Sequence, residues 1–361
     1  MMTNDASNLD AWDKIDGVPD PMETRSVVGH KNILDQLCAR YASGKIHHAW
    51  LLSGPRGIGK ATLAARFAGH VLRNPNPENA PEKYVPPPES DAVEGRISRG
   101  AHPNLLLMRR PWNERDKKWR SDLTVDEIRR TISFFGTSSA ENGWRVAIVD
   151  TADDLNASSA NALLKILEEP PARTILLILA HLPGRSLSTI RSRCQRLALH
   201  PLDEDQIVEA IKAVPMFTDV DENELRQAAK LSGGSVRRTI LIHTENGVDL
   251  FERLTTLAEK NGQPDWSAIH KLAGELSPAN RNEQYRLFLD LTHDFLSQKI
   301  RLNARSDSGQ SQVEFSTDIS KLAGWTDVWE KTRHSAEQTD AYNLDRKQVI
   351  LNLFSAIHEL A

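Results

Sequence analysis

The stretch AWLLSGPRGIGKATLAARF, residues 49–67, decides the fold that we expect for this chain. A short apolar run, Ala49–Leu52, meets a glycine-rich turn, Gly54–Gly59, and Lys60 opens a segment with helical spacing. This layout matches the P-loop pattern G-x-x-x-x-G-K-[ST], in which backbone N–H groups, a helix N-terminus and a lysine converge on a phosphate. The sequence therefore predicts a strand, a phosphate-binding turn and a helix.

One position of the motif departs from the pattern. Ala61 follows Lys60, where a Ser or Thr hydroxyl would hold Mg²⁺. Thr62 carries a hydroxyl, but one step along a helix rotates the side chain by about 100°. We therefore expect a loop that cradles a polyphosphate and holds Mg²⁺ poorly. The cofactor-binding residues predicted from this stretch are Gly54, Pro55, Arg56, Gly57, Ile58, Gly59, Lys60, Ala61 and Thr62.

Composition limits the possible functions. A chain of 361 residues with 39% hydrophobic and 26% charged residues predicts a globular protein of two or three domains. The net charge of −4 excludes a basic, DNA-coating protein, so any nucleic-acid contact must come from local patches or partners. The two cysteines, Cys38 and Cys194, exclude a disulfide scaffold and a four-cysteine zinc site. Without a signal-peptide layout or a long apolar run, we expect a cytoplasmic protein.

Further short apolar runs alternate with helical patterns after the P-loop. Apolar strands alternating with helices predict a parallel sheet covered on both faces, whose ligands bind at the carboxyl ends of the strands. Asp150 follows one of these runs directly and is therefore a candidate site residue beside the P-loop. The runs are Asn104–Met108, Arg145–Val149, Thr174–Leu179 and Arg196–Leu199.

Two polar segments lie outside this alternation. Residues 1–24 are rich in Asp, Asn, Gly and Pro, and we expect a flexible tail. Residues 74–103 contain seven prolines, which rule out an uninterrupted helix or a central strand. Long loops of this kind are functional or disordered, and here we favour disorder. The role of this Pro-rich insert stays open.

The segment RRPWNERDKKWR, Arg109–Arg120, contains six basic residues and two tryptophans. Such a mixture is compatible with nucleic-acid binding, because aromatic faces stack on bases and cations meet phosphates. Glu114 and Asp116 dilute the positive charge, and an exposed hairpin or loop without that role is the simpler interpretation. Both interpretations remain open at this point.

From Asp203 onward the patterns are helical, and Asp203 with Gln206 marks a helix start. The last predicted helix, Thr339–Leu360, places Ile350, Leu353, Phe354, Ile357 and Leu360 on one stripe. We therefore expect a tail at 1–24, a nucleotide-binding α/β domain at 25–200, a small helical lid at 201–247 and a helical C-terminal domain at 248–361.

Three motifs together resemble one protein family. They are NALLKILEEPP at 161–171, the triplet Ser192-Arg193-Cys194, and GGSVRR at 233–238. This combination resembles the delta-prime family of clamp-loader subunits of the bacterial DNA polymerase III holoenzyme. The resemblance implies an AAA+ P-loop domain, a helical lid and a C-terminal collar domain that holds five subunits in a ring.

The resemblance also implies roles for single residues. Asp150 matches the Walker B aspartate, and Thr151 stands where ATP-hydrolysing members place a water-activating glutamate. His181 matches the sensor position, commonly Thr or Asn, and Arg237 the lid arginine that reaches a bound nucleotide. Arg193 matches the arginine finger, a catalytic residue that acts on ATP held by the neighbouring subunit. An ordinary surface salt bridge for Arg193 and a solvated helix face for Arg237 are the alternatives.

The resemblance further implies partners: the gamma/tau and delta subunits, and the sliding clamp and primed DNA through the complex. With Ala61 and Thr151 in place of catalytic groups, it implies a stator within a DNA-directed DNA polymerase (nucleotidyltransferase) complex that binds ATP weakly and hydrolyses little. The alternative is an active AAA+ ATPase, either a gamma/tau-type motor or a helicase-loader relative. Relatives commonly carry a four-cysteine zinc module at the insert; without cysteines at 74–103, no zinc is expected.

Overall fold

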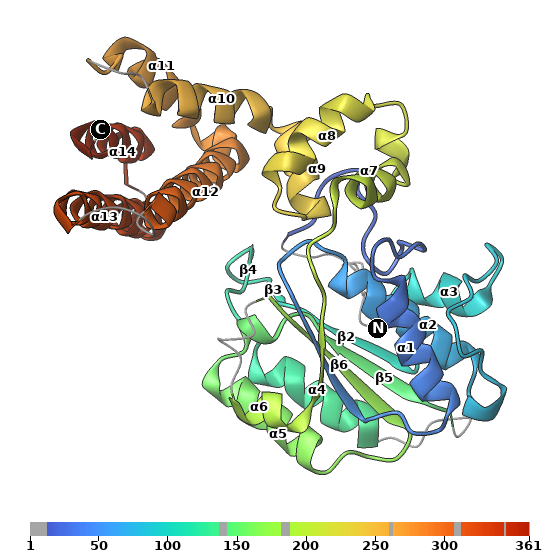
Figure 1. Cartoon of the computed structure of the whole chain (residues 1–361). Coiled ribbons are helices and arrows are strands. Elements are labelled where there is room, and N and C mark those ends of the chain that lie inside the picture. The colour runs from blue at the N-terminus through green and yellow to red at the C-terminus, as the bar shows by residue number, and fades with distance from the viewer. Residues whose placement is uncertain are drawn as a thin grey trace. The chain divides into compact units, whose positions relative to one another are not determined.

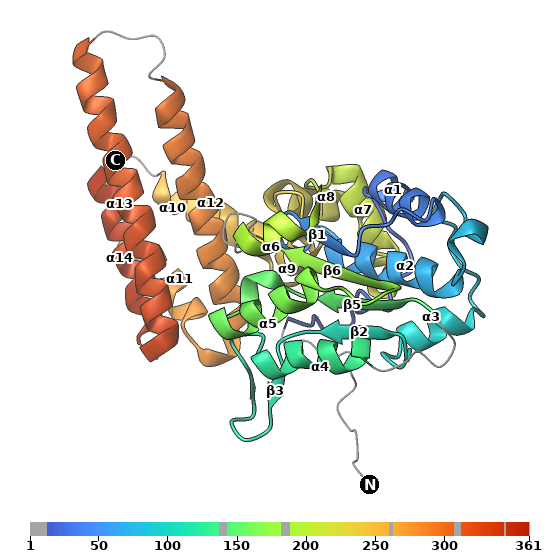
Figure 2. The same cartoon turned by 90° about the horizontal axis from the view of Figure 1, so that it is seen from below.

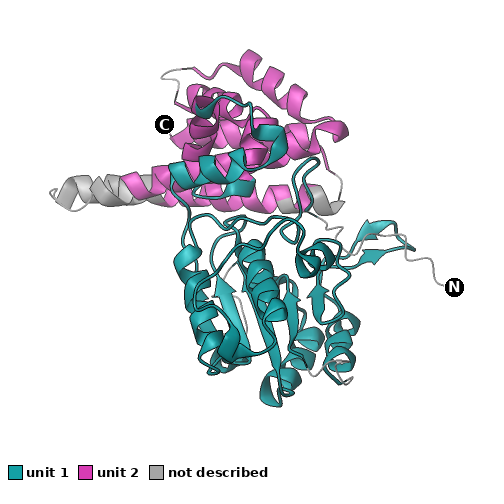
Figure 3. Ribbon diagram, turned by 90° about the vertical axis from the view of Figure 1, so that its right-hand side faces the viewer, with its two compact units in different colours: residues 1–222, 233–237 teal, residues 223–232, 238–361 magenta. Residues whose placement is uncertain are grey.

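The computed structural model of the protein describes residues 13–136, 143–181, 188–259, 263–306, 312–342 and 344–360. Contacts divide the chain into two compact units, which Figure 3 colours separately. Unit 1 comprises residues 1–222 and 233–237, and unit 2 comprises residues 223–232 and 238–361. The division falls inside the predicted lid at 201–247, and the three-domain boundaries stay a prediction.

Unit 1 is built on a five-stranded sheet in which every neighbouring pair is parallel. The parallel α/β fold predicted from the sequence is thereby confirmed (Figure 1). The short last strand is also present, as β7. β1 lies between β6 and β7, so the P-loop follows an interior strand of the sheet and not an edge strand. In spatial order the strands are β2 (Leu105–Met108), β5 (Arg145–Val149), β6 (Thr174–Ala180), β1 (Ala49–Ser53) and β7 (Gln195–Ala198).

Helices cover both faces of this sheet because alternate side chains of each strand point to opposite sides. Trp50 and Leu52 of β1 belong to a core cluster shared with α1 and α2, whereas Ala49 and Leu51 belong to a second cluster with α4, α5 and α6. The side chains of both clusters are almost completely buried. The helices are α1 (Lys31–Ala42), α2 (Lys60–Arg73), α4 (Val125–Gly136), α5 (Ala157–Glu168) and α6 (Ser188–Arg193).

The Pro-rich insert is folded, so the expectation of disorder at 74–103 is wrong. It contains a short 3₁₀ helix, η1 (Pro77–Asn79), and an α-helix, α3 (Ala92–Ile97), that packs on α2. Glu94 of α3 is 2% exposed and its carboxylate pairs with both Arg66 and Arg73 of α2. These buried ion pairs hold the insert against α2. No local sequence pattern predicts them.

Residues 13–24 also differ from the mobile tail that their composition predicted. Met22 is 1% exposed and belongs to the α1–α2 core cluster. Its carbonyl oxygen accepts a hydrogen bond of 2.8 Å from Nη2 of Arg66, a side chain with no solvent exposure. The apolar Met22 and the buried guanidinium together anchor this part of the chain to α2.

The segment Arg109–Arg120 forms a hairpin, a shape that is compatible with both of its interpretations. Its strands are β3 (Trp112–Asn113) and β4 (Lys118–Trp119), paired antiparallel. Unit 1 continues with α7 (Glu204–Lys212), which opens with a capping box. The backbone N–H of Gln206 donates to Asp203 Oδ1 at 2.8 Å, and that of Asp203 donates to Gln206 Oε1 at 3.2 Å. The predicted helix start is thereby confirmed. The remaining 3₁₀ turns are η2 (Ala152–Asp154) and η3 (Pro215–Phe217).

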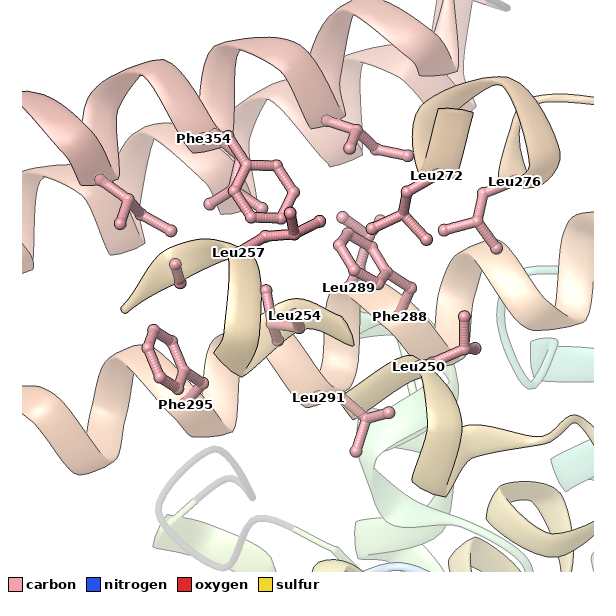
Figure 4. Packing of buried hydrophobic residues seen from close by; sticks show 14 of the residues in the cluster. Leu250, Leu254, Leu257, Leu272, Leu276, Phe288, Leu289, Leu291, Phe295 and Phe354 are labelled. Carbon is pink, nitrogen blue, oxygen red and sulfur yellow. The ribbon is translucent and has the colours of Figure 1, made fainter. Parts of the chain in front are cut away.

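The described residues of unit 2 form helices and the turns that join them. Its helices α12 and α13 run side by side, and α14 packs on α13 and α11 (Figure 2). Leucine and phenylalanine side chains from α10, α11, α12 and α14 meet in one core, shown in Figure 4. The elements are α8 (Glu222–Leu231), whose first residue lies in unit 1, α9 (Val236–Thr244), which also begins in unit 1, α10 (Gly247–Ala258), α11 (Trp266–Leu276), η4 (Ala279–Arg281), α12 (Asn282–Ser306), α13 (Gln312–Tyr342) and α14 (Arg346–Leu360).

Four residues of the predicted stripe of the last helix, Ile350, Leu353, Phe354 and Ile357, are each at most 3% exposed within this core. The fifth, Leu360, is partly buried and packs against the same core. The predicted start at Thr339 is wrong, because Thr339 belongs to α13 and α14 begins at Arg346. Asp345 marks the new start, since its carboxylate accepts from the backbone N–H of Lys347 at 2.8 Å. Within the described ranges, no helix is long and apolar enough to cross a membrane.

Candidate nucleotide-binding site

The glycines of the P-loop adopt backbone conformations that other residues rarely take. Gly57 has φ +78° and Gly59 has φ +98°. A Cβ at Gly57 would lie 2.4 Å from Oγ of Ser235 and 2.6 Å from Cβ of Arg237. Gly57 is therefore required both by its own φ and by the close approach of the segment 233–237.

That segment, which carries the GGSVRR motif, is hydrogen-bonded to the P-loop within unit 1. The hydroxyl of Ser235 donates to the carbonyl oxygen of Arg56 at 2.9 Å. The backbone N–H of Arg237 donates to the carbonyl oxygen of Gly57 at 3.3 Å. The structure thus brings the predicted lid arginine next to the predicted phosphate loop, although Gly57 and Arg237 are 180 residues apart in the sequence.

Lys60 is held by the loop that precedes it. Its Nζ donates to the carbonyl oxygens of Gly54 and Pro55, each at 2.6 Å, and the residue is 3% exposed. Burial lowers the pKa of Lys60 to about 8, although Asp150 and Asp153 act in the opposite direction. The ammonium therefore lies inside the loop, where a P-loop lysine would meet a phosphate.

A carboxylate from the amino-terminal segment lies among these cations. Asp13 Oδ2 is 2.8 Å from Nη2 of Arg56 and 3.9 Å from Nη1 of Arg237. Burial would raise the pKa of Asp13, but the charge of Arg237, followed by the hydrogen bond and charge of Arg56, brings it below its ordinary value. The chain itself thus supplies an anion to a P-loop arginine and to the lid arginine.

Asp150, the predicted Walker B residue, faces an arginine. Its Oδ2 lies 3.4 Å from Nε of Arg109, and burial raises the pKa of Asp150 against the lowering effect of that guanidinium. Arg109 also donates to both carboxylate oxygens of Asp20, at 2.7 and 3.3 Å. The amino-terminal segment therefore reaches the site twice, once at the P-loop through Asp13 and once beside Asp150 through Asp20.

The residues after Asp150 are engaged as well. Thr151 is 4% exposed, and its hydroxyl lies 2.9 Å from the carbonyl oxygen of Leu179 and 2.8 Å from Asp153 Oδ2. The same Asp153 oxygen accepts from the backbone N–H of His181, and Asp154 pairs with Arg110. Burial lowers the pKa of His181 to about 4, so its ring is neutral near pH 7.

These contacts test whether the residues present fit a nucleotide and its metal. The phosphate part fits: Gly57 supplies a turn with positive φ, and Lys60 and the N-terminus of α2 supply positive charge. The Mg²⁺ part does not fit, because Ala61 has no hydroxyl and packs partly buried against the core of α1 and α2. Among the described residues, no group of three or more His, Cys, Asp or Glu side chains could hold a metal ion.

Arg193, the predicted arginine finger, is placed elsewhere. Its Nη2 lies 2.8 Å from Oε1 of Glu168 on α5, and its Nη1 donates to the carbonyl oxygen of Thr189 at 3.1 Å. The Arg193 and Glu168 side chains are 37% and 50% exposed. Arg193 thus stands at the end of α6 in a solvent-exposed salt bridge, where another molecule could reach it.

Four site residues escape sequence reasoning: Asp13, Asp20, Arg109 and His30. Nε2 of His30 lies 2.9 Å from the carbonyl oxygen of Ile58, and because a carbonyl only accepts, this nitrogen carries the proton. Burial lowers the pKa of His30. No spacing pattern links these residues to the P-loop. The one available signal was the excess of acid in residues 1–24.

Comparisons with known proteins agree on one group. Residues 29–203 match the family described as DNA polymerase III, delta subunit. The DNA polymerase III subunit delta' of Pseudomonas aeruginosa is 34% identical over 189 residues, which are 52% of this chain and about half, 53%, of that protein. The delta' subunit of Escherichia coli is 27% identical over 258 residues, 71% of this chain and 73% of its own length.

A second kind of subunit is also similar. The DNA polymerase III subunit gamma of Buchnera aphidicola subsp. Acyrthosiphon pisum is 28% identical over 323 residues, covering 86% of this chain and 81% of that protein. Delta-prime and gamma subunits thus both resemble this chain. Sequence similarity does not distinguish the two kinds of subunit here, so the residues at the nucleotide site must indicate whether the chain hydrolyses ATP.

Proposed function

We propose that the chain is a clamp-loader subunit that acts as a stator. It resembles the delta-prime subunits of DNA polymerase III, and residues 29–203 match the family described as DNA polymerase III, delta subunit. In this role it joins gamma/tau and delta subunits in a cytoplasmic hetero-oligomer. The complex loads the sliding clamp onto primed DNA during replication. The chain is then part of a DNA-directed DNA polymerase without carrying out nucleotidyl transfer or much ATP hydrolysis itself.

The proposal that the chain hydrolyses little ATP rests on the contacts made by the carboxylates that follow β5. A general base must reach the proton that it removes. Thr151 offers no carboxylate, Asp153 accepts from Thr151 and from the backbone of His181, and Asp154 pairs with Arg110. These contacts support a site that does not activate water.

The P-loop supports binding of nucleotide without turnover. Gly57, Lys60 and Arg237 are the residues that would hold the phosphates of ATP, together with the N-terminus of α2. ATP would supply a polyanion that satisfies Lys60 and Arg237. Asp13 already supplies an anion to Arg237 and Arg56, so we expect the affinity for ATP to be weak.

Arg193 supports an action on a neighbouring subunit. Its guanidinium is partly exposed, and in the described part of the chain it contacts Glu168, Thr189 and Ser192 on the surface of α5 and α6. A guanidinium presented to a transferring phosphoryl group stabilises the charge that develops on its oxygens, and such fingers are worth roughly 10³–10⁵ in rate. We propose that Arg193 serves the ATP site of the adjacent gamma/tau subunit.

The second candidate function is an ATPase motor of the gamma/tau type, or a helicase-loader relative. The similarity to the Buchnera gamma subunit over most of both chains favours it. Ala61 and Thr151 oppose it. ATP turnover by the isolated chain separates the two: we expect negligible turnover, whereas turnover at a motor's rate, lost in Lys60→Ala, would establish the alternative.

The Arg193 assignment is tested in the reconstituted complex with gamma/tau and delta subunits. Arg193→Ala should leave assembly intact and lower both DNA-stimulated ATP hydrolysis and clamp loading, because one ATP site loses its finger. Arg193→Lys should not rescue, because lysine lacks the planar fork. Arg196→Ala is the matched control, an exposed arginine three residues away on β7.

Glu168→Gln decides between a finger and a salt bridge. If Arg193 only stabilises the chain through Glu168, both variants should behave alike. If Arg193 acts on a neighbour, Glu168→Gln should retain most of the hydrolysis that Arg193→Ala loses. Wild-type hydrolysis and clamp loading in Arg193→Ala would sink the assignment.

A further inference from the structure

The hairpin β3–β4 protrudes from unit 1 and is not used by the proposed nucleotide site (Figures 2 and 3). Trp112 and Trp119 face each other across its two strands, with ring centroids 5.4 Å apart and an interplanar angle of 73°. Trp112 is 39% exposed. Trp112 pairs with Trp119 across the strands and still leaves a large part of its ring open to a ligand.

The tip of the hairpin is ordered by its own polar groups. The side-chain oxygen of Asn113 accepts from the backbone N–H of Arg115 at 3.1 Å and from that of Asp116 at 3.4 Å. Nδ2 of Asn113 donates to the carboxylate of Asp116 at 2.5 Å. Lys117 takes a left-handed conformation with φ +47°. One of the two acids of the hairpin is therefore used inside the turn, which leaves the cations to dominate its surface.

The six basic residues of Arg109–Arg120 divide into two groups. At the stem, Arg109 pairs with Asp20 and Asp150. Arg110, also at the stem, pairs with Asp154. The other four lie on the hairpin itself and are exposed, and in the described part of the chain none of them has an ion-pair partner. They are Arg115, Lys117, Lys118 and Arg120.

We propose that this hairpin, residues 111–120, binds single-stranded nucleic acid. Aromatic faces stack on bases without regard to sequence, and lysine and arginine side chains meet the phosphates between them. Trp112 supplies the exposed ring, Trp119 supports it edge-on, and four exposed cations lie on the same hairpin. The net charge of −4 for the whole chain makes the local cation group the natural place for such a contact.

The experiment uses the full chain and a labelled oligothymidine of about 16 nucleotides, the upper range of site sizes for single-strand binding modules. Fluorescence anisotropy is measured at several salt concentrations. The charge variant is Lys117→Gln/Lys118→Gln. Its matched control is Lys45→Gln/Lys83→Gln, two exposed lysines of the same unit with the same change in net charge. Circular dichroism verifies that each variant is folded.

We expect the charge variant to bind about tenfold or more weakly and to reduce the slope of log K against log salt by about 1.4, since each contacted phosphate of a single strand contributes about 0.7. Trp112→Leu should weaken binding roughly fivefold or more through lost stacking while leaving the salt slope unchanged. The control should match wild type in affinity and slope.

Four results would overturn the proposal: no binding by wild type, an equal loss in the Lys45/Lys83 control, wild-type affinity in Trp112→Leu, or equal affinity for a blunt duplex of the same length. If the hairpin variants bind the oligonucleotide normally but fail to join the complex, the hairpin is a protein contact and the proposal fails as well. The assay needs no partner subunit, so its result is independent of the stator proposal.

Discussion

Asp13 Oδ2 accepts a hydrogen bond of 2.8 Å from Nη2 of Arg56, and this contact ties the amino-terminal segment to the P-loop. Arg237 lies 3.9 Å from the same oxygen. The Asp13 carboxylate thus lies beside Arg56 and Arg237, two arginines that we expect to face the phosphates of a bound nucleotide. The consequence concerns nucleotide affinity.

Removing this carboxylate should strengthen nucleotide binding. In Asp13→Asn the internal anion no longer competes for Arg56 and Arg237, and a larger fraction of the protein is competent to bind. We expect ATP to bind severalfold more tightly, as measured by titration with a fluorescent ATP analogue. Asp16→Asn, an exposed acid of the same segment, is the control and should behave as wild type. Adding Lys60→Ala should abolish the gain; equal affinities in both aspartate variants would contradict this.

The folded insert should depend on Glu94. Glu94→Gln leaves the guanidinium of Arg66, which has no solvent exposure, without its carboxylate partner. Breaking one side of a buried ion pair typically costs about 3–5 kcal/mol. We expect a loss of this size in urea denaturation. Glu82→Gln, on an exposed residue of the same insert, should change the free energy of unfolding by less than about 0.5 kcal/mol. Similar effects of the two substitutions would show that the buried triad does not hold the insert.

His70 should make the protein sensitive to acid. Burial, with a further contribution from Arg73, lowers the pKa of His70 from 6.5 to about 4. The unfolded chain therefore binds more protons between these values, and stability is lost as the pH falls from 6.5 through 4, by up to about 3 kcal/mol. His70→Leu should flatten this part of the curve of unfolding free energy against pH.

His200→Gln, which removes an exposed histidine of the same unit, serves as the comparison and should leave the curve unchanged. Urea denaturation at pH 7 and pH 4.5 is sufficient to measure the difference. A His70→Leu variant as sensitive to acid as wild type would mean that His70 titrates normally.

Zinc should not be present in stoichiometric amount. The chain has two cysteines, Cys38 and Cys194, and none within residues 74–103, where the family resemblance would lead us to expect a zinc module. Elemental analysis of protein purified without a histidine tag should find far less than one zinc per chain. One zinc that survives dialysis against a chelator would contradict the prediction and direct attention to the histidines.

The sequence by itself predicts the elements that depend on local pattern. The P-loop and the parallel strands both follow from apolar periodicity, glycines and turn residues that lie within a few positions of one another. The capping box at Asp203 and Gln206 has the same origin. Arg237 was assigned to the nucleotide site through the family resemblance, and the structure places it at Gly57, while its role stays a proposal.

Tertiary structure alone decided the contacts between charges that are distant in sequence. Asp13 meets Arg56 across 43 residues, and Arg109 meets Asp20 across 89. In the sequence, Glu94 is one polar residue among others in a Pro-rich segment, and only the folded structure places Arg66 beside it. A helix or strand imposes a period on the residues that build it, whereas an ion pair between segments imposes none, because its partners are chosen only when the chain has folded.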